Sequence, residues 1–270
     1  MNLPSSTNRK RLVLLDSHAI LHRAYHALPD FSSHKGEPTG ALYGLSTMLM
    51  KIITDLKPDY IAACYDLPGA TFRHEAYKEY KAGRKKPDDE LVQQMDRSRD
   101  VYKAFNVPTY EAPGFEADDI LGTIVKQVKP KDIDVIVASG DMDTLQLVDD
   151  ERVRVYTLKK GINDTILYDE KAVVERFGFV PALLPDYKGL RGDPSDNIIG
   201  ISGIGDKTAT DLIKKYGTIE SMYKVLKKNP QQLLEDGFKE RVVKLLEGGE
   251  EEALFSKTLA TIRRDAPCPY

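Results

Sequence analysis

The sequence predicts an α/β fold in which a mostly parallel central sheet is flanked by helices. Short apolar runs typical of buried strands alternate with runs of helical spacing, and this alternation favours parallel strands joined by helices. Three of the strand-like runs end in an aspartate. After about residue 180 the spacing of apolar residues becomes mostly helical, which predicts a second, helical subdomain.

The first predicted elements follow one another closely. Residues 11–16 (RLVLLD) form a short apolar strand, and the spacing of AILHRAYHAL predicts a helix directly after it. Residues 40–56 carry a stripe of leucine and isoleucine that is typical of a helix packed on a sheet. Residues 60–66 (YIAACYD) form the next strand.

The later elements come after a long charged insertion. Residues 69–105 lack a clear core pattern and are interrupted by Lys-Lys-Pro. VPTYEAP is then an extended segment that leads into a helix ending near Val128. DVIVASGD (134–141) is the third strand that ends in an acid, and VRVYTL and TILYD are further strands.

Composition limits the class of protein. The chain has 270 residues, 41% hydrophobic and 30% charged, which suits a large domain or two smaller ones, divided here as 1–180 and 181–270. No stretch reads as a signal peptide or is apolar enough to span a bilayer. With only Cys64 and Cys268, a disulfide framework is not expected, which fits a reducing cytoplasm.

Acidic residues gather where the predicted strands end. Parallel strands point their carboxyl ends the same way, so acids at those ends are expected to meet at one edge of the sheet. The motifs PGFEADDILG, SGDMD and RGDPSDN add further acids beside turns or strand ends. The candidates are Asp16, Asp66, Glu116, Asp118, Asp119, Asp141, Asp143, Asp193 and Asp196.

This acidic pattern predicts a divalent-metal site. Carboxylates crowded into one pocket would repel each other and take up protons unless cations neutralised them. Mg²⁺ prefers oxygen ligands, and two ions about 4 Å apart can hold the attacking and leaving oxygens of a phosphodiester. Any one of these acids is better explained as a helix cap or a solvated charge, and GDMD alone could be a DxD motif. Only the joint pattern favours the metal.

Three histidines offer a weaker candidate. His18, His22 and His26 could line one stripe of a helix, and imidazoles in that spacing can bind zinc. Packing is the favoured interpretation, with His26 packed and His18 or His22 near the edge of the acidic site.

Two motifs indicate nucleic-acid binding although the net charge is −3. GISGIGDKTATDLIKKYG places Gly203 and Gly205 in a tight turn between two helices, where backbone amides together with Lys207 and Thr208 can grip phosphate without reading bases. A plain helical hairpin is the structural alternative.

The second motif lies within residues 73–86, which hold six basic and two acidic residues with aromatic residues interleaved. Such a segment suits single-stranded nucleic acid, and its candidates are Arg73, Tyr80, Lys81 and Arg84. If the segment is helical, Lys81 and Arg84 share a face. A solvated surface helix is the alternative.

The motifs together resemble a known family. CYDLPGATFRHEAYKEYKAGR, PGFEADDILG, SGDMDTLQLV and GDPSDNIIGISGIGDKTA occur in the order found in the 5′-nuclease domain of bacterial DNA polymerase I, within the flap endonuclease superfamily. The resemblance extends from about Lys10 to the end of the chain. It implies a PIN-like core, a helical arch over the site at about 69–105, and a helix-hairpin-helix element (H3TH) with K⁺ at its turn.

The resemblance also implies a role for each candidate. Asp16, Asp66 and Asp118 resemble ligands of a first metal. Asp118, Asp141, Asp143 and Asp196 resemble ligands of a second. Glu116, Asp119 and Asp193 match acids that act directly or through water. Lys81 and Arg84 match arch residues that contact the scissile phosphate, so the catalytic candidates are Lys81, Arg84, Asp118 and Asp141.

The implied function is a structure-specific 5′-3′ exonuclease and flap endonuclease in replication and repair. It is expected to use two or more Mg²⁺ ions, with Mn²⁺ as a substitute, on DNA with a 5′ flap, nick or overhang and on RNA primers. A monomer is expected, either as a domain tethered to a polymerase or as a stand-alone nuclease. The rivals are a PIN-type endoribonuclease, which predicts no glycine hairpin, and a non-catalytic junction-binding module, which predicts that several acids are replaced.

Overall fold

The computed structural model describes residues 9–128, 133–150, 152–160 and 164–268. The chain forms two compact units. The sheet unit comprises Met1–Thr71, Lys86–Asp169 and Ile262–Tyr270, and the helical unit comprises Phe72–Lys85 and Glu170–Thr261. This division differs from the single boundary expected near residue 180, because one internal segment packs with the helical unit and the last residues pack with the sheet unit.

Within the described residues the sheet has six strands, in the order β3-β2-β1-β4-β5-β6. The first five are parallel to their neighbours and β6 is antiparallel to β5, which confirms the mostly parallel sheet. The strands are β1 (Lys10–Asp16), β2 (Tyr60–Cys64), β3 (Thr109–Tyr110), β4 (Ile133–Ala138), β5 (Val153–Lys160) and β6 (Asp164–Tyr168).

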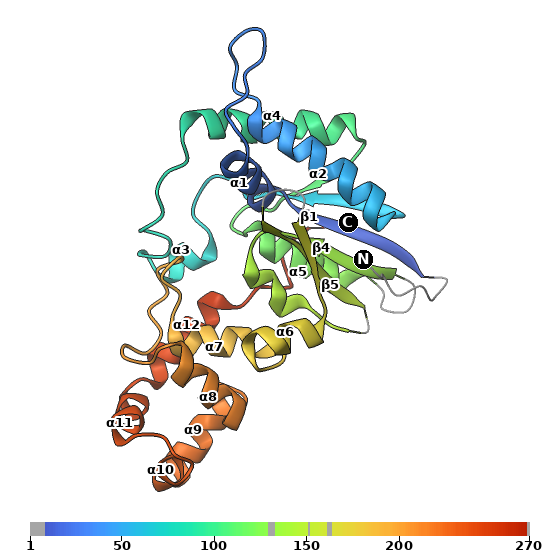
Figure 1. Cartoon of the computed structure of the whole chain (residues 1–270). Coiled ribbons are helices and arrows are strands. Elements are labelled where there is room, and N and C mark those ends of the chain that lie inside the picture. The colour runs from blue at the N-terminus through green and yellow to red at the C-terminus, as the bar shows by residue number, and fades with distance from the viewer. Residues whose placement is uncertain (1–8, 129–132, 151, 161–163, 269–270) are drawn as a thin grey trace. The chain divides into compact units, whose positions relative to one another are not determined.

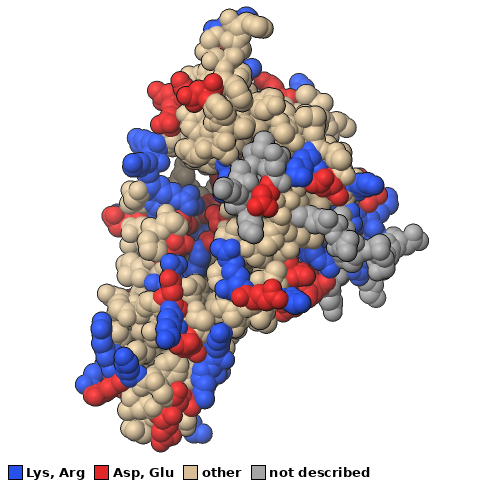
Figure 2. All heavy atoms as spheres, viewed as in Figure 1, with Lys and Arg blue, Asp and Glu red and all other residues tan. Residues whose placement is uncertain are grey.

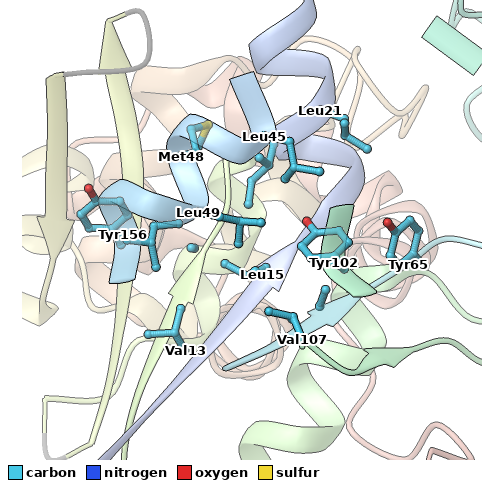
Figure 3. Close-up of a cluster of buried hydrophobic side chains, with 14 of the residues drawn as sticks. Val13, Leu15, Leu21, Leu45, Met48, Leu49, Tyr65, Tyr102, Val107 and Tyr156 are labelled. Carbon is cyan, nitrogen blue, oxygen red and sulfur yellow. The ribbon is translucent and has the colours of Figure 1, made fainter. Parts of the chain in front are cut away.

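Helices cover both faces of this sheet, as Figure 1 shows. On one face lie α1 (Ser17–Ala27), α2 (Gly40–Leu56) and α4 (Asp89–Ala104), and on the other lies α5 (Ala117–Gln127). Figure 3 shows the core under the first three helices, where Val13 and Leu15 of β1 meet Leu45 and Leu49 of α2 and Tyr102 of α4. This packing fixes the strand ends that carry the acids.

The segment 69–105, for which a helical arch was predicted, is divided between the two units. It contains the short helix α3 (Phe72–Ala76), a turn, and then α4, and its two halves belong to different units. Lys81 lies in the turn with a positive φ of 58°. The expectation that Lys81 and Arg84 share a helix face is therefore wrong, because the backbone at Lys81 leaves the helical region.

Helix α4 lies within the predicted helical arch, but its apolar pattern does not reveal it, because half of its buried stripe is polar. Its buried residues are Leu91, Gln94, Ser98 and Tyr102. The Gln94 side-chain oxygen accepts hydrogen bonds from the backbone N–H groups of Ala41 (2.7 Å) and Leu42 (3.3 Å), at the start of α2. A buried glutamine thus satisfies helix-terminal donors that otherwise have no partner.

The helical unit confirms the prediction for the C-terminal part. Its other elements are α6 (Glu170–Phe177), a 3₁₀ turn η2 (Pro181–Leu183), α7 (Leu184–Arg191), α8 (Asp206–Tyr216), α9 (Ile219–Lys228), α10 (Gln231–Glu235), α11 (Glu240–Gly248) and α12 (Glu250–Ala260). The buried Asp186 carboxylate joins three of these helices by accepting from Ile219 N (2.9 Å) and Lys257 Nζ (2.6 Å). Figure 2 shows Lys and Arg side chains interspersed with acids over α8–α11.

Among the residues that the structure describes, no helix has the length and apolar character needed to cross a bilayer.

Candidate active site

Three neighbouring strands bring three acids to one edge of the sheet. Asp16 is the last residue of β1, and Asp66 and Asp141 follow β2 and β4, which flank β1. The register pairs Asp16 with Cys64 and Leu15 with Ala138, so the three strands end at the same level. The convergence predicted for these strand ends is confirmed.

Helix α5 adds Asp118 to the same edge. Burial raises the pKa of Asp118 well above its usual range, and the charges of nearby acids raise it further, in the order Asp141, Asp16, Asp143 and Asp66. Asp118 nevertheless keeps a partly exposed surface. We call these five residues, Asp16, Asp66, Asp118, Asp141 and Asp143, the acidic edge.

The pKa of Asp16 is raised by burial and by a neighbouring acid as well. Burial and the charge of Asp66 raise its pKa to about 6, although hydrogen bonds from the Ser139 hydroxyl (2.6 Å) and the Ala19 N–H (3.1 Å) oppose the shift. Raised carboxyl pKa values mean that the negative charges lack enough compensation from the protein itself. Perturbed groups of this kind concentrate at functional sites.

The acidic edge fits a hard divalent cation in its chemistry. All its ligand atoms are carboxylate oxygens, which Mg²⁺ and Mn²⁺ favour, and a dication would relieve the repulsion that raises the pKa of Asp118. The edge is not a preformed cage, because no three His, Cys, Asp or Glu side chains of the described ranges are placed to hold a metal together. Several oxygens face protein donors instead, as for Asp66, which accepts from Ala117 N at 2.7 Å.

Asp119 is held in a different way. It is fully buried, and its two carboxylate oxygens accept hydrogen bonds from the backbone N–H groups of Glu116 (3.1 Å) and Arg263 (2.8 Å). Glu116 is the N-cap of α5, so Asp119 and Glu116 form a capping box. These bonds explain Asp119 without a metal, by the capping role that was the alternative for each acid.

The last residues of the chain fasten two acid-bearing elements, α5 and the 3₁₀ helix η1 (Met142–Leu147). The N–H of Ile262 donates to the Gln146 side chain of η1 (2.9 Å), and the N–H of Ala266 donates to the Thr123 hydroxyl of α5 (3.0 Å). A Cβ on Gly122 would lie 2.6 Å from a methyl of Ile262, so α5 needs glycine there. Gln146 and Thr123 carry no signal in the sequence, because their partners are backbone groups over 100 residues away.

Of the two predictions for the histidines, the one that places His18 or His22 near the acidic site is confirmed and the one for His26 is not. His18 lies near the acidic edge, where its Nδ1 is 3.1 Å from both the backbone N and a carboxylate oxygen of Asp66. His22 and His26 stack with ring centroids 6.0 Å apart, and both are exposed. The prediction that His26 is packed is wrong, because it lies on the outward side of α1.

Asp196 belongs to the helical unit, where it is surrounded by cations. It accepts a hydrogen bond from the Tyr80 hydroxyl (3.0 Å), pairs with the Arg84 guanidinium, and lies 4.0 Å from Lys81 Nζ. The Lys81 N–H also donates to the Asp196 carbonyl (2.9 Å). The structure thus brings both predicted phosphate-contacting cations to one predicted metal ligand.

Asp193, in the same loop, is also neutralised. It pairs with Lys188 (2.5 Å) and accepts from the N–H and hydroxyl of Ser195. Burial alone would raise the pKa of Asp193, but the Lys188 charge and these hydrogen bonds lower it below its usual range.

Two residues predicted to contact nucleic acid are buried inside the helical unit. Arg73 is 3% exposed and donates to the carbonyls of Leu259 (2.8 Å) and Thr261 (2.9 Å). Tyr80 is also 3% exposed, with its ring packed in a cluster that includes Ile198 and Leu259. The structure does not support them as stacking or phosphate contacts, because neither presents a surface to a ligand.

The glycine hairpin has the expected form. It joins α7 and α8, Gly203 has a positive φ of 92°, and Gly205 is the N-cap of α8. Gly203, Gly205 and Lys207 are exposed and Thr208 is half-buried, while Ile204 anchors the turn in the core. This eleven-residue helix thus begins at exposed residues, where its first backbone N–H groups can bind phosphate.

The parallel sheet with its acidic edge and the glycine-turn helical hairpin occur together in one chain. The chain belongs to the 5′-3′ exonuclease family. The family model described as the 5′-3′ exonuclease N-terminal resolvase-like domain matches residues 11–178, and the model of its C-terminal SAM fold matches residues 179–270.

Curated relatives are longer proteins. DNA polymerase I of Bacillus caldotenax is 40% identical over 259 residues, which is 96% of this chain and 28% of the relative. DNA polymerase I of Bacillus subtilis (strain 168) is 40% identical over 261 residues, 97% of this chain and 29% of the relative. The chain therefore spans less than a third of the length of these relatives.

Solved structures share the fold. A zinc-bound structure of T5 5′-exonuclease has a TM-score of 0.75 with 21% identity, covering 93% of this chain and 89% of that one. A bacteriophage T5 flap endonuclease in a pseudo-enzyme–product complex with DNA and metal ions has a TM-score of 0.76 with 20% identity and the same coverage. At these identities the likeness establishes the fold.

Proposed function

We propose that this chain hydrolyses phosphodiester bonds of DNA, and of RNA primers, near junctions between single strand and duplex. It would act as a Mg²⁺-dependent 5′-3′ exonuclease and flap endonuclease in replication and repair. One observation carries the metal dependence: Asp118 stands among four other carboxylates, and burial together with their charges raises its pKa. Among structural neighbours, the T5 proteins hold divalent metal ions and one is bound to DNA.

The acidic edge would hold the ions. Asp16, Asp66, Asp118, Asp141 and Asp143 supply the oxygens in the sheet unit, and Glu116, Asp193 and Asp196 remain further candidates. When bound, two Mg²⁺ ions would acidify a water molecule and offset charge on the scissile phosphate. Asp119 would act by holding the N-terminus of α5, and with it Asp118, in place. Mn²⁺ is the expected substitute because it favours the same oxygen ligands.

Lys81 and Arg84 would neutralise the phosphate. Their present partner is Asp196, so a phosphate or metal that engages this cluster must exchange one set of ionic contacts for another. A guanidinium and an ammonium aimed at developing negative charge are among the largest contributors to catalysis of this kind.

The hairpin between α7 and α8 would hold duplex DNA. Its exposed backbone amides and Lys207 suit phosphate and carry no base-reading group, so binding there should not depend on sequence. We also propose K⁺ at this turn, a monomeric protein, and a polymerase domain in the same full-length chain, as the relatives' lengths indicate.

A flap-cleavage assay tests the proposal. A 5′-labelled DNA flap should be cut in Mg²⁺, should remain intact in EDTA, and should be cut again when Mn²⁺ is added. Binding of the flap in EDTA, measured by fluorescence anisotropy, should persist. Binding without cleavage under every metal condition would favour the non-catalytic module instead.

A further inference from the structure

We propose that Ser139 is a positioning residue of the acidic edge, whose hydroxyl orients the Asp16 carboxylate and the Asp141 backbone for the binding of a divalent cation. The inference rests on the proposed function, because it assigns a role within the same metal site. Ser139 directly follows β4, which leads to Asp141 and pairs with β1, the strand that ends in Asp16.

The Ser139 hydroxyl makes two hydrogen bonds at once. It donates to an oxygen of Asp16 at 2.6 Å and accepts from the backbone N–H of Asp141 at 2.9 Å. Ser139 is 3% exposed, so water does not compete freely for these bonds. A hydroxyl is suited to the task because it has one donor and two acceptor sites.

The first bond completes the orientation of Asp16. The other carboxylate oxygen of Asp16 accepts from the N–H of Ala19 (3.1 Å), at the start of α1. With both oxygens held, the carboxylate cannot rotate freely, and less conformational freedom remains to be lost when a cation binds.

The second bond extends the effect to another acid. The Asp141 side chain accepts from the N–H of Asp143 (2.9 Å) and caps η1. Ser139 therefore holds the peptide from which η1 begins, and the placement of Asp143 depends on that peptide. Three of the five acids are linked to this one hydroxyl.

A neutral donor has an advantage at this position. Asp196, in the helical unit, is held by Arg84 and Lys81, and a cation held so closely competes with a metal for the carboxylate. Serine orients Asp16 but adds no positive charge, so the acidic edge still gains compensation when a metal ion binds. Outer partners of metal-binding residues commonly change affinity 10–100-fold when they are removed.

The test is Mn²⁺ binding to the full chain, measured by electron paramagnetic resonance as free Mn²⁺ disappears. Ser139→Ala should weaken Mn²⁺ affinity by roughly 10-fold or more. Ser139→Thr keeps the hydroxyl and should restore affinity to within about 3-fold of the unmodified protein. A thermal melt in EDTA identifies any loss that comes from misfolding.

Ser98→Ala is the matched control. Ser98 is also a buried serine of the sheet unit, but its hydroxyl contacts Tyr65 (2.5 Å) and the Met95 carbonyl (2.5 Å) rather than a carboxylate. It should lower the melting temperature and leave Mn²⁺ affinity unchanged. Equal loss of affinity in Ser98→Ala and Ser139→Ala would overturn the assignment, since the effect would then be one of general stability.

A flap-cleavage assay distinguishes a failure of the Ser139 role from a failure of the proposed function on which that role rests. Ser139→Ala should need a Mg²⁺ concentration roughly 10-fold higher for half-maximal flap cleavage. If the unmodified chain binds Mn²⁺ and cleaves but Ser139→Ala behaves identically, only the role of Ser139 is refuted. If the unmodified chain neither binds Mn²⁺ nor cleaves, the proposed function fails and the role of Ser139 fails with it.

Discussion

The acidic edge of the sheet unit and the Asp193–Asp196 loop of the helical unit use the same residue type in opposite ways. At the acidic edge, aspartates have other aspartates as neighbours, and burial with mutual repulsion raises the pKa of Asp16 and Asp118. In the loop, Lys188 and nearby hydrogen bonds lower the pKa of Asp193, and Arg84 and Lys81 pair with Asp196.

The difference shows which acids are prepared for an outside cation. A carboxylate paired with a lysine or arginine is already compensated and gains little from a metal unless that pair is broken. A group of carboxylates that repel each other gains directly when a dication binds. The acidic edge is therefore the primary metal site in our proposal, whereas the loop holds its acids against the cations Lys188, Lys81 and Arg84 of its own unit.

The largest effect should come from an acid of the acidic edge. Asp141→Asn removes a ligand charge while keeping the size of the side chain, so cleavage of a 5′ flap should fall by roughly three orders of magnitude or more. Flap affinity in EDTA should stay near that of the unmodified chain. If the variant still cleaves at about a tenth of the normal rate, Asp141 is not a ligand of the metal site.

Lys81→Ala should have the next largest effect and should separate the two regions. Loss of a cation that stabilises charge in the transition state slows such reactions by about 10²–10³-fold. Affinity of the sheet unit's acids for Mn²⁺ should be unchanged, because Lys81 pairs with Asp196 rather than with the acidic edge. Single-turnover cleavage and Mn²⁺ titration of the same preparation measure both quantities, and unchanged cleavage would refute the role of Lys81.

Stability without metal should fall as pH rises from about 4 to 6. The folded pKa of Asp16 is about 6 and its ordinary value is near 3.8. An acid with a raised folded pKa contributes stability at low pH and loses that contribution as pH rises through the folded value. For Asp16 the loss is on the order of 1–3 kcal/mol.

Urea unfolding in EDTA at about pH 4 and about pH 7 measures this loss, and saturating Mg²⁺ at pH 7 should restore stability. Asp193 does not interfere, because its pKa is lowered and its contribution is lost only as pH falls below about 4. Asp118→Asn should reduce the difference in unfolding free energy between the two pH values. Equal stability at both, with and without Mg²⁺, would contradict the view that the acidic edge is short of positive charge.

The sequence was sufficient for the acids at strand ends because topology alone places them. Once the runs ending in Asp16, Asp66 and Asp141 are recognised as parallel strands, their carboxyl ends must share an edge. The start of α5 follows because its acids precede an apolar helical run. These predictions need only periodicity and chain direction.

Other residues were out of reach because long-range backbone partners determine their roles. Asp119 resembled a metal ligand, yet its oxygens bind N–H groups of Glu116 and Arg263. Helix α4 lacked an apolar stripe because Gln94 and Ser98 fill buried positions by making hydrogen bonds. Ser139 is the serine of the SGDMD motif. A serine two residues before an acid at a strand end indicates a hydroxyl that can support that acid.

The smallest effect concerns two arginines from one basic segment. Arg73 is 3% exposed and binds two carbonyls, whereas the Arg84 side chain is 49% exposed. Arg73→Ala should lower the free energy of unfolding by about 1–3 kcal/mol, because the carbonyls of Leu259 and Thr261 lose their donor. Folded Arg73→Ala should bind flap DNA with an unchanged Kd, and Arg73→Lys should recover part of the stability.

Arg84→Ala should have the opposite effect: it should weaken flap binding and alter the unfolding free energy by less than about 1 kcal/mol. Chemical unfolding and anisotropy titration of the three variants test this, and weaker flap binding by a fully stable Arg73→Ala would return Arg73 to the nucleic-acid surface.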